Sequence, residues 1–101
     1  MIDPMTPAQI TAAIESLESW RYDADRHALY RQLLFPGFPQ ALSAMMEIGF
    51  AAEQADHHPE WANVFDRLDI WLTTHDANGV SQKDVDLAHV INRLMISRLR
   101  R

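Results

Sequence analysis

The chain has 101 residues, of which 48% are hydrophobic and 23% charged, and it contains no cysteine. This composition predicts one compact domain, residues 1–101, and it excludes disulfides, a thiol nucleophile and a cysteine-ligated zinc cluster. A formal net charge of −5 argues against direct binding of nucleic acid, and no apolar run reaches the ~18 residues of a membrane span. We therefore expect a cytoplasmic protein that partners neither nucleic acid nor membrane.

The N-terminal third predicts a helix followed by a β-hairpin. Thr6 and Pro7 are residue types that favour a helix N-cap and first turn, which predicts a helix over residues 6–17. Apolar and polar residues then alternate in two runs, 20–24 and 29–35, on either side of a polar turn. This period of two is typical of paired strands.

The next predicted element, a helix over residues 39–56, is the longest and most apolar. Its polar residues share one narrow stripe, so we expect most of its circumference, Met45 and Met46 included, to be buried. Pro59 should end it, because proline disfavours helical geometry in the residue before it. Glu53 falls within the apolar arc, where a carboxylate needs a hydrogen-bonding partner. His57, four residues further along the helix, is in position to be that partner.

The C-terminal part predicts a second hairpin and a third helix. Residues 61–65 and 68–74 alternate in the manner of two strands joined by a short turn. Ser81 with Asp84 three residues later resembles a capping box, so a helix should run over 81–101. This helix is apolar on two sides. One side can cover a sheet, and the other suggests contact with a second subunit.

The predicted order α-β-β-α-β-β-α favours an α+β fold, a four-stranded antiparallel sheet with three helices packed on one face. Three element ends could then meet at one edge. They bring His57 and His58 from the end of the second helix, His75 from the end of the last strand, and Asp84 from the first turn of the last helix. Imidazoles, which exchange protons near neutral pH, suit general acid–base catalysis on a neutral organic substrate.

Other interpretations of these residues stay open at this point. Adjacent histidines after a helix are often only a polar loop, and Glu53 and His57 can form a purely structural pair. Asp84 can serve as a helix cap alone. Three histidines with carboxylates also fit the ligand chemistry of a zinc or iron site. The remaining two histidines of the chain, His27 and His89, are expected at the surface.

A longer pattern in this region is more specific. Glu53 precedes residues 57–88, which have the sequence HHPEWANVFDRLDIWLTTHDANGVSQKDVDLA. The spaced set formed by Glu53, the HHP triplet, Phe65, the Thr74-His75 pair and Asp84 resembles the signature of the pterin-4a-carbinolamine dehydratase family. The resemblance extends over residues 20–93.

The resemblance implies dehydration of 4a-hydroxytetrahydropterin (pterin-4a-carbinolamine) to quinonoid dihydropterin, which recycles the cofactor of aromatic amino acid hydroxylases. It implies a metal-free enzyme with no cofactor besides its pterin substrate, assembled as a homodimer or homotetramer. Relatives of this fold can also act as dimerisation cofactors of transcription regulators, so a non-catalytic regulatory module is the alternative. The family pattern makes His57 and His75 the acid–base pair, with His58 orienting the pterin. The implied substrate-binding residues are Glu53, His57, His58, Pro59, Thr74, His75, Asp76, Ala77 and Asp84.

Overall fold

A computed structural model of the protein describes residues 2–100, and its elements follow the predicted α-β-β-α-β-β-α order. The helices are α1 (Pro7–Ser16), α2 (Phe38–Gln54) and α3 (Gln82–Met95). The strands are β1 (Arg21–Asp23), β2 (Ala28–Leu34), β3 (Glu60–Val64) and β4 (Arg67–Leu72). A short 3₁₀ helix, η1 (His75–Ala77), between β4 and α3 is the one element that the sequence pattern did not predict.

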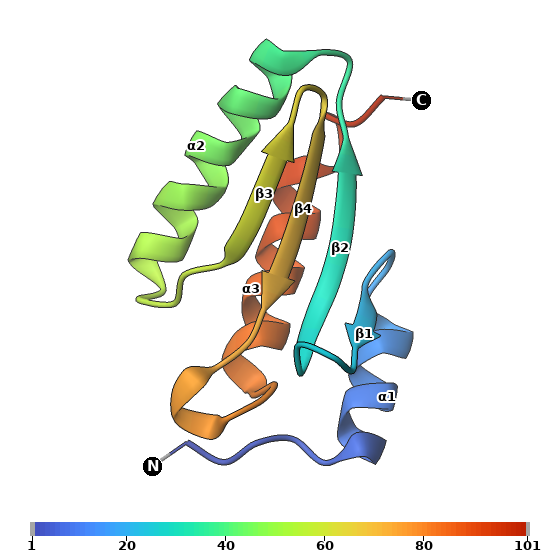
Figure 1. The fold of residues 1–101 in the computed structure, drawn as a ribbon, viewed down its shortest axis with the longest axis vertical. Coiled ribbons are helices and arrows are strands. Elements are labelled where there is room, and N and C mark those ends of the chain that lie inside the picture. The colour runs from blue at the N-terminus through green and yellow to red at the C-terminus, as the bar shows by residue number, and fades with distance from the viewer. Residues whose placement is uncertain (1, 101) are drawn as a thin grey trace.

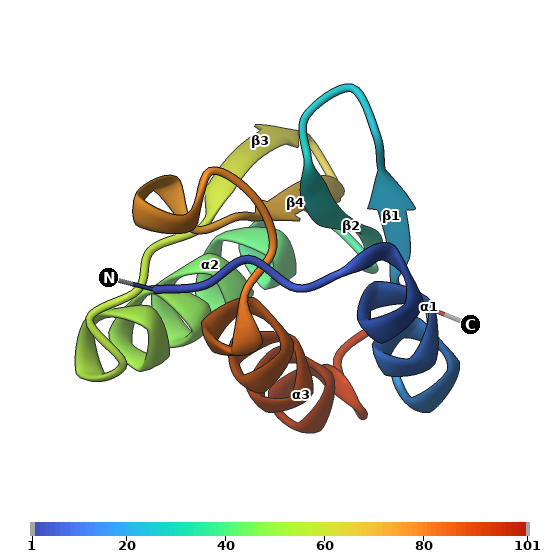
Figure 2. The same ribbon diagram turned by 90° about the horizontal axis from the view of Figure 1, so that it is seen from below.

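The four strands form one antiparallel sheet in the order β1-β2-β4-β3. The two hairpins are joined through the central pair, in which Leu29 of β2 lies opposite Leu72 of β4. All three α-helices cover the same face of this sheet (Figure 1, Figure 2). The predicted α+β architecture is therefore confirmed. Within residues 2–100 the structure has no helix long and apolar enough to cross a membrane.

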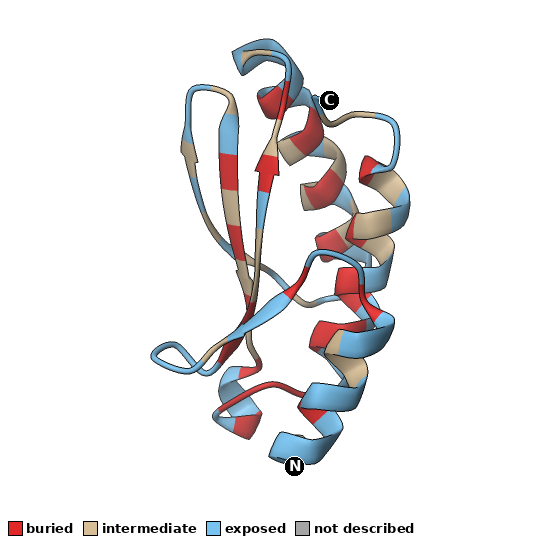
Figure 3. Cartoon of the chain, turned by 90° about the vertical axis from the view of Figure 1, so that its right-hand side faces the viewer, coloured by how far each residue is buried: buried red, intermediate tan, exposed pale blue. Residues whose placement is uncertain are grey.

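The core lies between the sheet and the helices (Figure 3). Strand β4 shows how the alternating pattern builds it, since Leu68, Ile70 and Leu72 are fully buried and the residues between them are not. Ile48 of α2 and Ile91 of α3 belong to the same core cluster and are also fully buried. One continuous apolar layer thus fixes the positions from which the site residues project.

Helix α2 buries only one face, so the prediction that most of its circumference is covered was wrong. The buried residues, mostly small, allow close approach to the sheet, and Met45 is half-buried at their margin. A stripe of apolar residues on the other face remains exposed, Met46 included. The buried residues are Ala41, Ala44, Ile48 and Ala52. The exposed stripe, here called the α2 stripe, consists of Phe38, Leu42, Met46 and Phe50, which are 44%, 48%, 59% and 69% exposed.

The C-terminal end of α2 is set by a backbone motif rather than by Pro59. Asp56 adopts a left-handed conformation with φ of 50°. Its N–H donates to the Glu53 carbonyl, and the His57 N–H donates to the Ala52 carbonyl. This pair of bonds is the Schellman arrangement, with Asp56 where glycine is commonest. The helix therefore stops at Gln54, and the chain turns sharply before the histidines.

Helix α3 also differs from its prediction at the C-terminal end and on its second apolar side. It ends at Met95, and the Arg100 N–H donates to the Leu34 carbonyl at the end of β2. Arg101 lies outside the described residues. On the second apolar side, Leu87 is buried and Leu94 packs half-buried against the core. Most of that side is therefore covered within the chain itself, with Val90 and Leu94 left partly exposed.

Candidate active site

Three histidines border one cleft of about 440 Å³ at the end of the sheet where β4 leads into η1. His57 and His58 follow the turn that ends α2, and His75, separated from the end of β4 by two residues, opens η1. Their meeting at one edge confirms the juxtaposition predicted from the order of elements. The volume lies within the roughly 300–1,000 Å³ that is typical of small-molecule sites.

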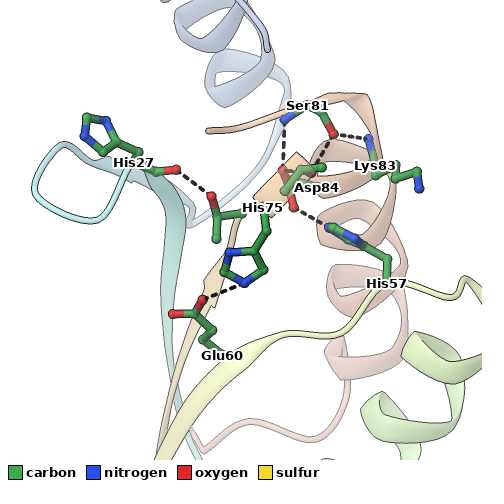
Figure 4. A network of polar contacts seen from close by, with 9 residues as sticks. His27, His57, Glu60, His75, Ser81, Lys83 and Asp84 are labelled. Atoms are coloured by element: carbon green, nitrogen blue, oxygen red, sulfur yellow. Dashed lines mark hydrogen bonds and ion pairs between the residues drawn. The ribbon is translucent and has the colours of Figure 1, made fainter. Parts of the chain in front are cut away.

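His57 is held by a buried carboxylate. Its Nε2 lies 2.5 Å from Oδ1 of Asp84, in the first turn of α3 (Figure 4). The Asp84 side chain has no exposed surface, whereas that of His57 is 11% exposed. The ring therefore has Asp84 behind it and only a small part of its surface open to the cleft.

Asp84 is itself fixed by two further residues, Thr74 in the loop after β4 and Ser81 at the N-cap of α3. Its Oδ2 accepts hydrogen bonds from the Thr74 hydroxyl at 2.8 Å and from the Ser81 N–H at 2.9 Å. The second bond belongs to the capping box of α3, which confirms the predicted cap. Ser81 and Thr74 are both buried, and their hydroxyls lie 2.6 Å apart. Asp84 therefore accepts three hydrogen bonds, which satisfy a carboxylate that would otherwise be costly to bury.

The loop between β4 and α3 is shaped to bring these groups together. Thr74 and Gly79 pair as an isolated β-bridge, which closes the loop on itself. Asn78 adopts a left-handed conformation with φ of 54°, a backbone region that asparagine tolerates better than most residues. The closed loop presents the buried Thr74 hydroxyl to Asp84 and leaves His75 at the surface.

His75 is the most exposed of the three histidines. Its side chain is 83% exposed, and its Nε2 lies 3.4 Å from Oε2 of Glu60, the first residue of β3 (Figure 4). His75 is therefore free to reach a molecule in the cleft, with a carboxylate beside it.

His58 and Glu53 form a separate pair, which corrects the expected partnership of Glu53 with His57. The His58 Nε2 lies 2.8 Å from Glu53 Oε1, and the two side chains are 58% and 79% exposed. Glu53 therefore occupies the solvated side of α2 and not a buried apolar arc. The expected i,i+4 contact fails because α2 ends at Gln54, so His57 is no longer on the helix.

The cleft contains most of the residues implied by the family pattern, and some that the sequence did not reveal. Those on its surface are His57, His58, Pro59, Thr74, His75 and Asp76. Three others do not border it, since Asp84 lies behind His57, Ala77 is buried, and Glu53 meets only His58. The additional lining residues are Ile2, Asp56, Glu60 and Lys83. The sequence position of Lys83 could have indicated its place at the cleft, because it directly precedes Asp84 in the predicted first helical turn.

Acidic and basic groups are mixed around the cleft. Asp56, Glu60 and Asp76 supply carboxylates, and Lys83 supplies an ammonium group at the N-terminal end of α3. Within residues 2–100, no three histidine or carboxylate side chains are grouped so as to hold a metal ion. The arrangement suits proton exchange with a small polar molecule that is bound between the histidines.

Comparison with known proteins points to one family. A family model described as pterin 4 alpha carbinolamine dehydratase matches residues 3–94. A protein of Rhizorhabdus wittichii named "Putative pterin-4-alpha-carbinolamine dehydratase" is 45% identical over 93 residues, covering 92% of this chain and 96% of its own. A protein of the same name from Rhodopseudomonas palustris is 39% identical, with 93% of each chain covered.

A solved structure agrees with these sequences. The crystal structure of a transcriptional coactivator/pterin dehydratase from Brucella melitensis superposes with a TM-score of 0.88 and 34% sequence identity. The alignment covers 91% of this chain and 98% of the Brucella chain.

Proposed function

Because the chain belongs to the pterin-4a-carbinolamine dehydratase family, we propose that it dehydrates 4a-hydroxytetrahydropterin to quinonoid dihydropterin and water. It is thus an enzyme of the hydro-lyase class. The observation that carries the proposal is the cleft bordered by His57, His58 and His75, with Asp84 bound behind His57.

The reaction requires two proton transfers. The C4a–O bond breaks, and the departing hydroxyl takes a proton from a general acid and leaves as water. A base removes a proton from a ring nitrogen, and the electron pair of that N–H bond forms the new double bond of the quinonoid ring. No electrons are exchanged with another molecule, so the mechanism that we propose uses no cofactor besides the pterin substrate.

His57 is placed to be the base. An ionised Asp84 can only accept hydrogen bonds, so the short contact puts the proton of a neutral His57 ring on Nε2. This leaves Nδ1 as the atom with a free lone pair, able to accept the ring-nitrogen proton. Asp84 then faces the imidazolium that forms and stabilises it, as a carboxylate does behind a catalytic histidine.

His75 is then the acid, since it is the most exposed histidine of the cleft and lies beside Glu60. In this assignment His75 gives its proton to the 4a-hydroxyl as the C4a–O bond lengthens. His58 contacts and orients the pterin, and its position is held through Glu53. Glu53 therefore acts through His58 rather than by touching the substrate.

The reaction that produces the substrate indicates the role of this enzyme in the cell. A 4a-hydroxytetrahydropterin arises when an aromatic amino acid hydroxylase uses its pterin cofactor, so we expect such an enzyme to be made in the same cytoplasm. The dehydratase would return the pterin for reduction and reuse. A hydroxylase gene beside the gene for this chain would support this recycling role.

The proposal is tested by adding the purified protein to freshly generated 4a-hydroxytetrahydropterin and following dehydration by absorbance. His57→Ala and His75→Ala should each lower kcat by about 10²–10⁴-fold, the usual contribution of a general acid or base. His27→Asn is the matched control, because His27 is an exposed histidine with φ of 51°, which asparagine tolerates. A folded protein that gives no acceleration over buffer would contradict the activity, and unchanged kcat in both alanine variants would contradict the two roles.

The α2 stripe supports two further proposals. Four apolar side chains at every fourth position form a continuous exposed surface along one helix, which is typical of an interface. We propose that this surface joins copies of the chain into a homodimer or homotetramer. The alternative function, a dimerisation cofactor for a transcription regulator, would use the same surface, and the Brucella protein is named a transcriptional coactivator as well as a pterin dehydratase.

A further inference from the structure

A second cavity, of about 500 Å³, lies between β2, the C-terminal half of α3 and the chain around the end of α1. It has no lining residue in common with the histidine cleft. Lys83 borders the cleft and Arg93 borders the cavity, and the two lie ten positions apart in α3, or about 15 Å along the helix axis. This is therefore a separate place on the molecule, with no part in the proposed dehydration.

Arg31 is half-buried and brings its positive charge to the edge of the apolar layer, where it borders this cavity. It lies in β2 between Leu29 and Leu33, which are both fully buried. Because side chains two positions apart share a face of a strand, Arg31 lies on the helix-covered face with them. Burial lowers the pKa of the Arg31 guanidinium below its ordinary value, and the Glu18 carboxylate acts in the opposite direction.

The hydrogen bonding of Arg31 is incomplete. Its Nη1 donates to the Asn92 side-chain oxygen, a neutral acceptor that also accepts from Trp20 Nε1 at 2.7 Å. Its Nε is buried without a partner, the one such side-chain atom found in residues 2–100. No ion pair within the same residues joins Arg31 to a carboxylate. The partial desolvation of this half-buried cation is thus offset only by a neutral contact and a more distant charge.

We propose that this cavity binds a small organic monocarboxylate with an apolar body, whose carboxylate lies against the Nη groups of Arg31, because the buried Nε has no surface open to the cavity. The planar guanidinium matches a carboxylate in shape and charge. Arg93 adds a second positive charge at the same cavity, and the exposed Ile96 and half-buried Leu99 offer apolar surface to the body of the ligand. Glu18 also borders the cavity, and its negative charge disfavours a multiply charged ligand such as inorganic phosphate.

The ligand class is tested by titrating the full-length protein with 3-phenylpropionate and following amide resonances by NMR. We expect saturable shifts centred on Arg31, Asn92 and Ile96. The uncharged isostere 3-phenylpropionamide should bind at least about tenfold more weakly, because it leaves the guanidinium without its anion. Inorganic phosphate should give no saturable shifts at these residues. Equal binding of acid and amide, or no saturation by the acid at up to about 10 mM, would overturn the proposal.

Three variants separate a ligand site from a purely structural arginine. Arg31→Met should abolish saturable binding, and Arg93→Gln should weaken it about two- to fivefold, as expected of an exposed charge. Arg21→Gln, which removes the same charge from a strand residue whose guanidinium lies over the Tyr30 ring, should bind the acid as the native protein does. Unchanged binding in Arg93→Gln together with Arg31→Met, or equal loss in Arg21→Gln, would contradict the site.

Stability gives an independent measurement. Asn92 still accepts from Trp20 when Arg31 is replaced, so Arg31→Met strands no partner. Without ligand, its denaturation midpoint should therefore equal or exceed that of the native protein, because a desolvated charge has been replaced by an apolar chain of similar length. A lower midpoint would make Arg31 a structural residue and overturn the inference. If Arg31→Met cannot be prepared folded, Arg93→Gln and the acid–amide comparison still decide the question.

Discussion

Asp84 has no exposed surface, yet its carboxylate receives hydrogen bonds from the chain after α2, from the chain after β4 and from the N-cap of α3. Its two carboxylate oxygens make different contacts. Oδ2 accepts the Thr74 and Ser81 bonds that hold the loop, and Oδ1 faces His57. One side chain thus joins the structure of the loop to the orientation and tautomer of a histidine in the cleft.

Asp84→Asn separates these two tasks. The amide oxygen can keep the Thr74 and Ser81 bonds, which places the amide NH₂ opposite His57 and forces the imidazole proton from Nε2 to Nδ1. We expect kcat to fall by about 10²–10⁴-fold with a much smaller change in KM, because the lone pair no longer faces the substrate. Steady-state kinetics check this split. A variant that loses affinity while keeping kcat would show that Asp84 does not orient the base.

Tyr30, on the outer face of the sheet, should make the stability of the protein depend on pH. Burial raises the pKa of the Tyr30 phenol above its ordinary value of 10.0, and its hydrogen bond to Asp69 acts in the same direction. The fold thus favours the neutral phenol, so this contribution is complete below pH 10 and is lost as pH rises above it. Urea midpoints of the native protein should fall more steeply above about pH 10 than those of Tyr30→Phe. Parallel plots of urea midpoint against pH for the two proteins would contradict this contribution of Tyr30.

The location of the three histidines could be predicted from the sequence better than the identity of their hydrogen-bonding partners. The three histidines could be placed at one edge because each follows an element end that the sequence marks. The partners could not, because contact rules such as i,i+4 hold only while the helix continues, and α2 stops at Gln54. His57 therefore meets Asp84, 27 positions away, through tertiary packing that local spacing does not encode.

At the scale of elements, the end of α2 decides where two of the histidines point. The Schellman turn at Asp56 reverses the chain immediately before His57. Element types and order were predictable from periodicity and from helix-capping residues, which act locally. The C-terminal end of α2 was not predictable in this way. Glycine and asparagine are the residues that usually mark a left-handed cap, and aspartate gives no such signal.

Substitution at Asp56 tests this ending. Its φ of 50° strains any residue with a Cβ, so Asp56→Gly should raise the free energy of unfolding by about 0.5–1 kcal/mol, in the range of other cap optimisations. Asp56→Val should lower it by about 1–2 kcal/mol, since a β-branched residue fits the left-handed region poorly. Chemical denaturation measures both. Equal stabilities of the glycine and valine variants would show that this turn is not a strained cap.

At the scale of the whole molecule, the exposed α2 stripe is the feature that a single chain leaves unexplained. An amphipathic pattern predicts that a helix has an apolar face, but it cannot say which apolar residues meet the same chain and which meet another. Helices α2 and α3 show different outcomes, since most of the second apolar side of α3 is covered internally and that of α2 is not.

A charge on the stripe should reduce the assembly to monomers. In Met46→Glu the carboxylate would lose its hydration on association, so we expect light scattering to give the mass of one chain, 11.6 kDa, where the native protein gives a multiple. Gln40→Glu, an equal change of charge at an exposed polar position of α2, is the control and should keep the native mass. A native protein of monomer mass, or an unchanged mass in Met46→Glu, would contradict the proposed interface.

The central strand pair also has a consequence for how the site comes into being. Each hairpin closes locally, but β2 and β4 join residues as distant as Leu29 and Leu72, with α2 and β3 in the intervening chain. Forming that pair requires closure of a long loop, which makes it a slow, high-contact-order step of folding. His57 and Asp84 come from segments on either side of β4, the strand that this step positions. Catalytic competence should therefore appear late in refolding, with the docking of the two hairpins and not with the formation of either one.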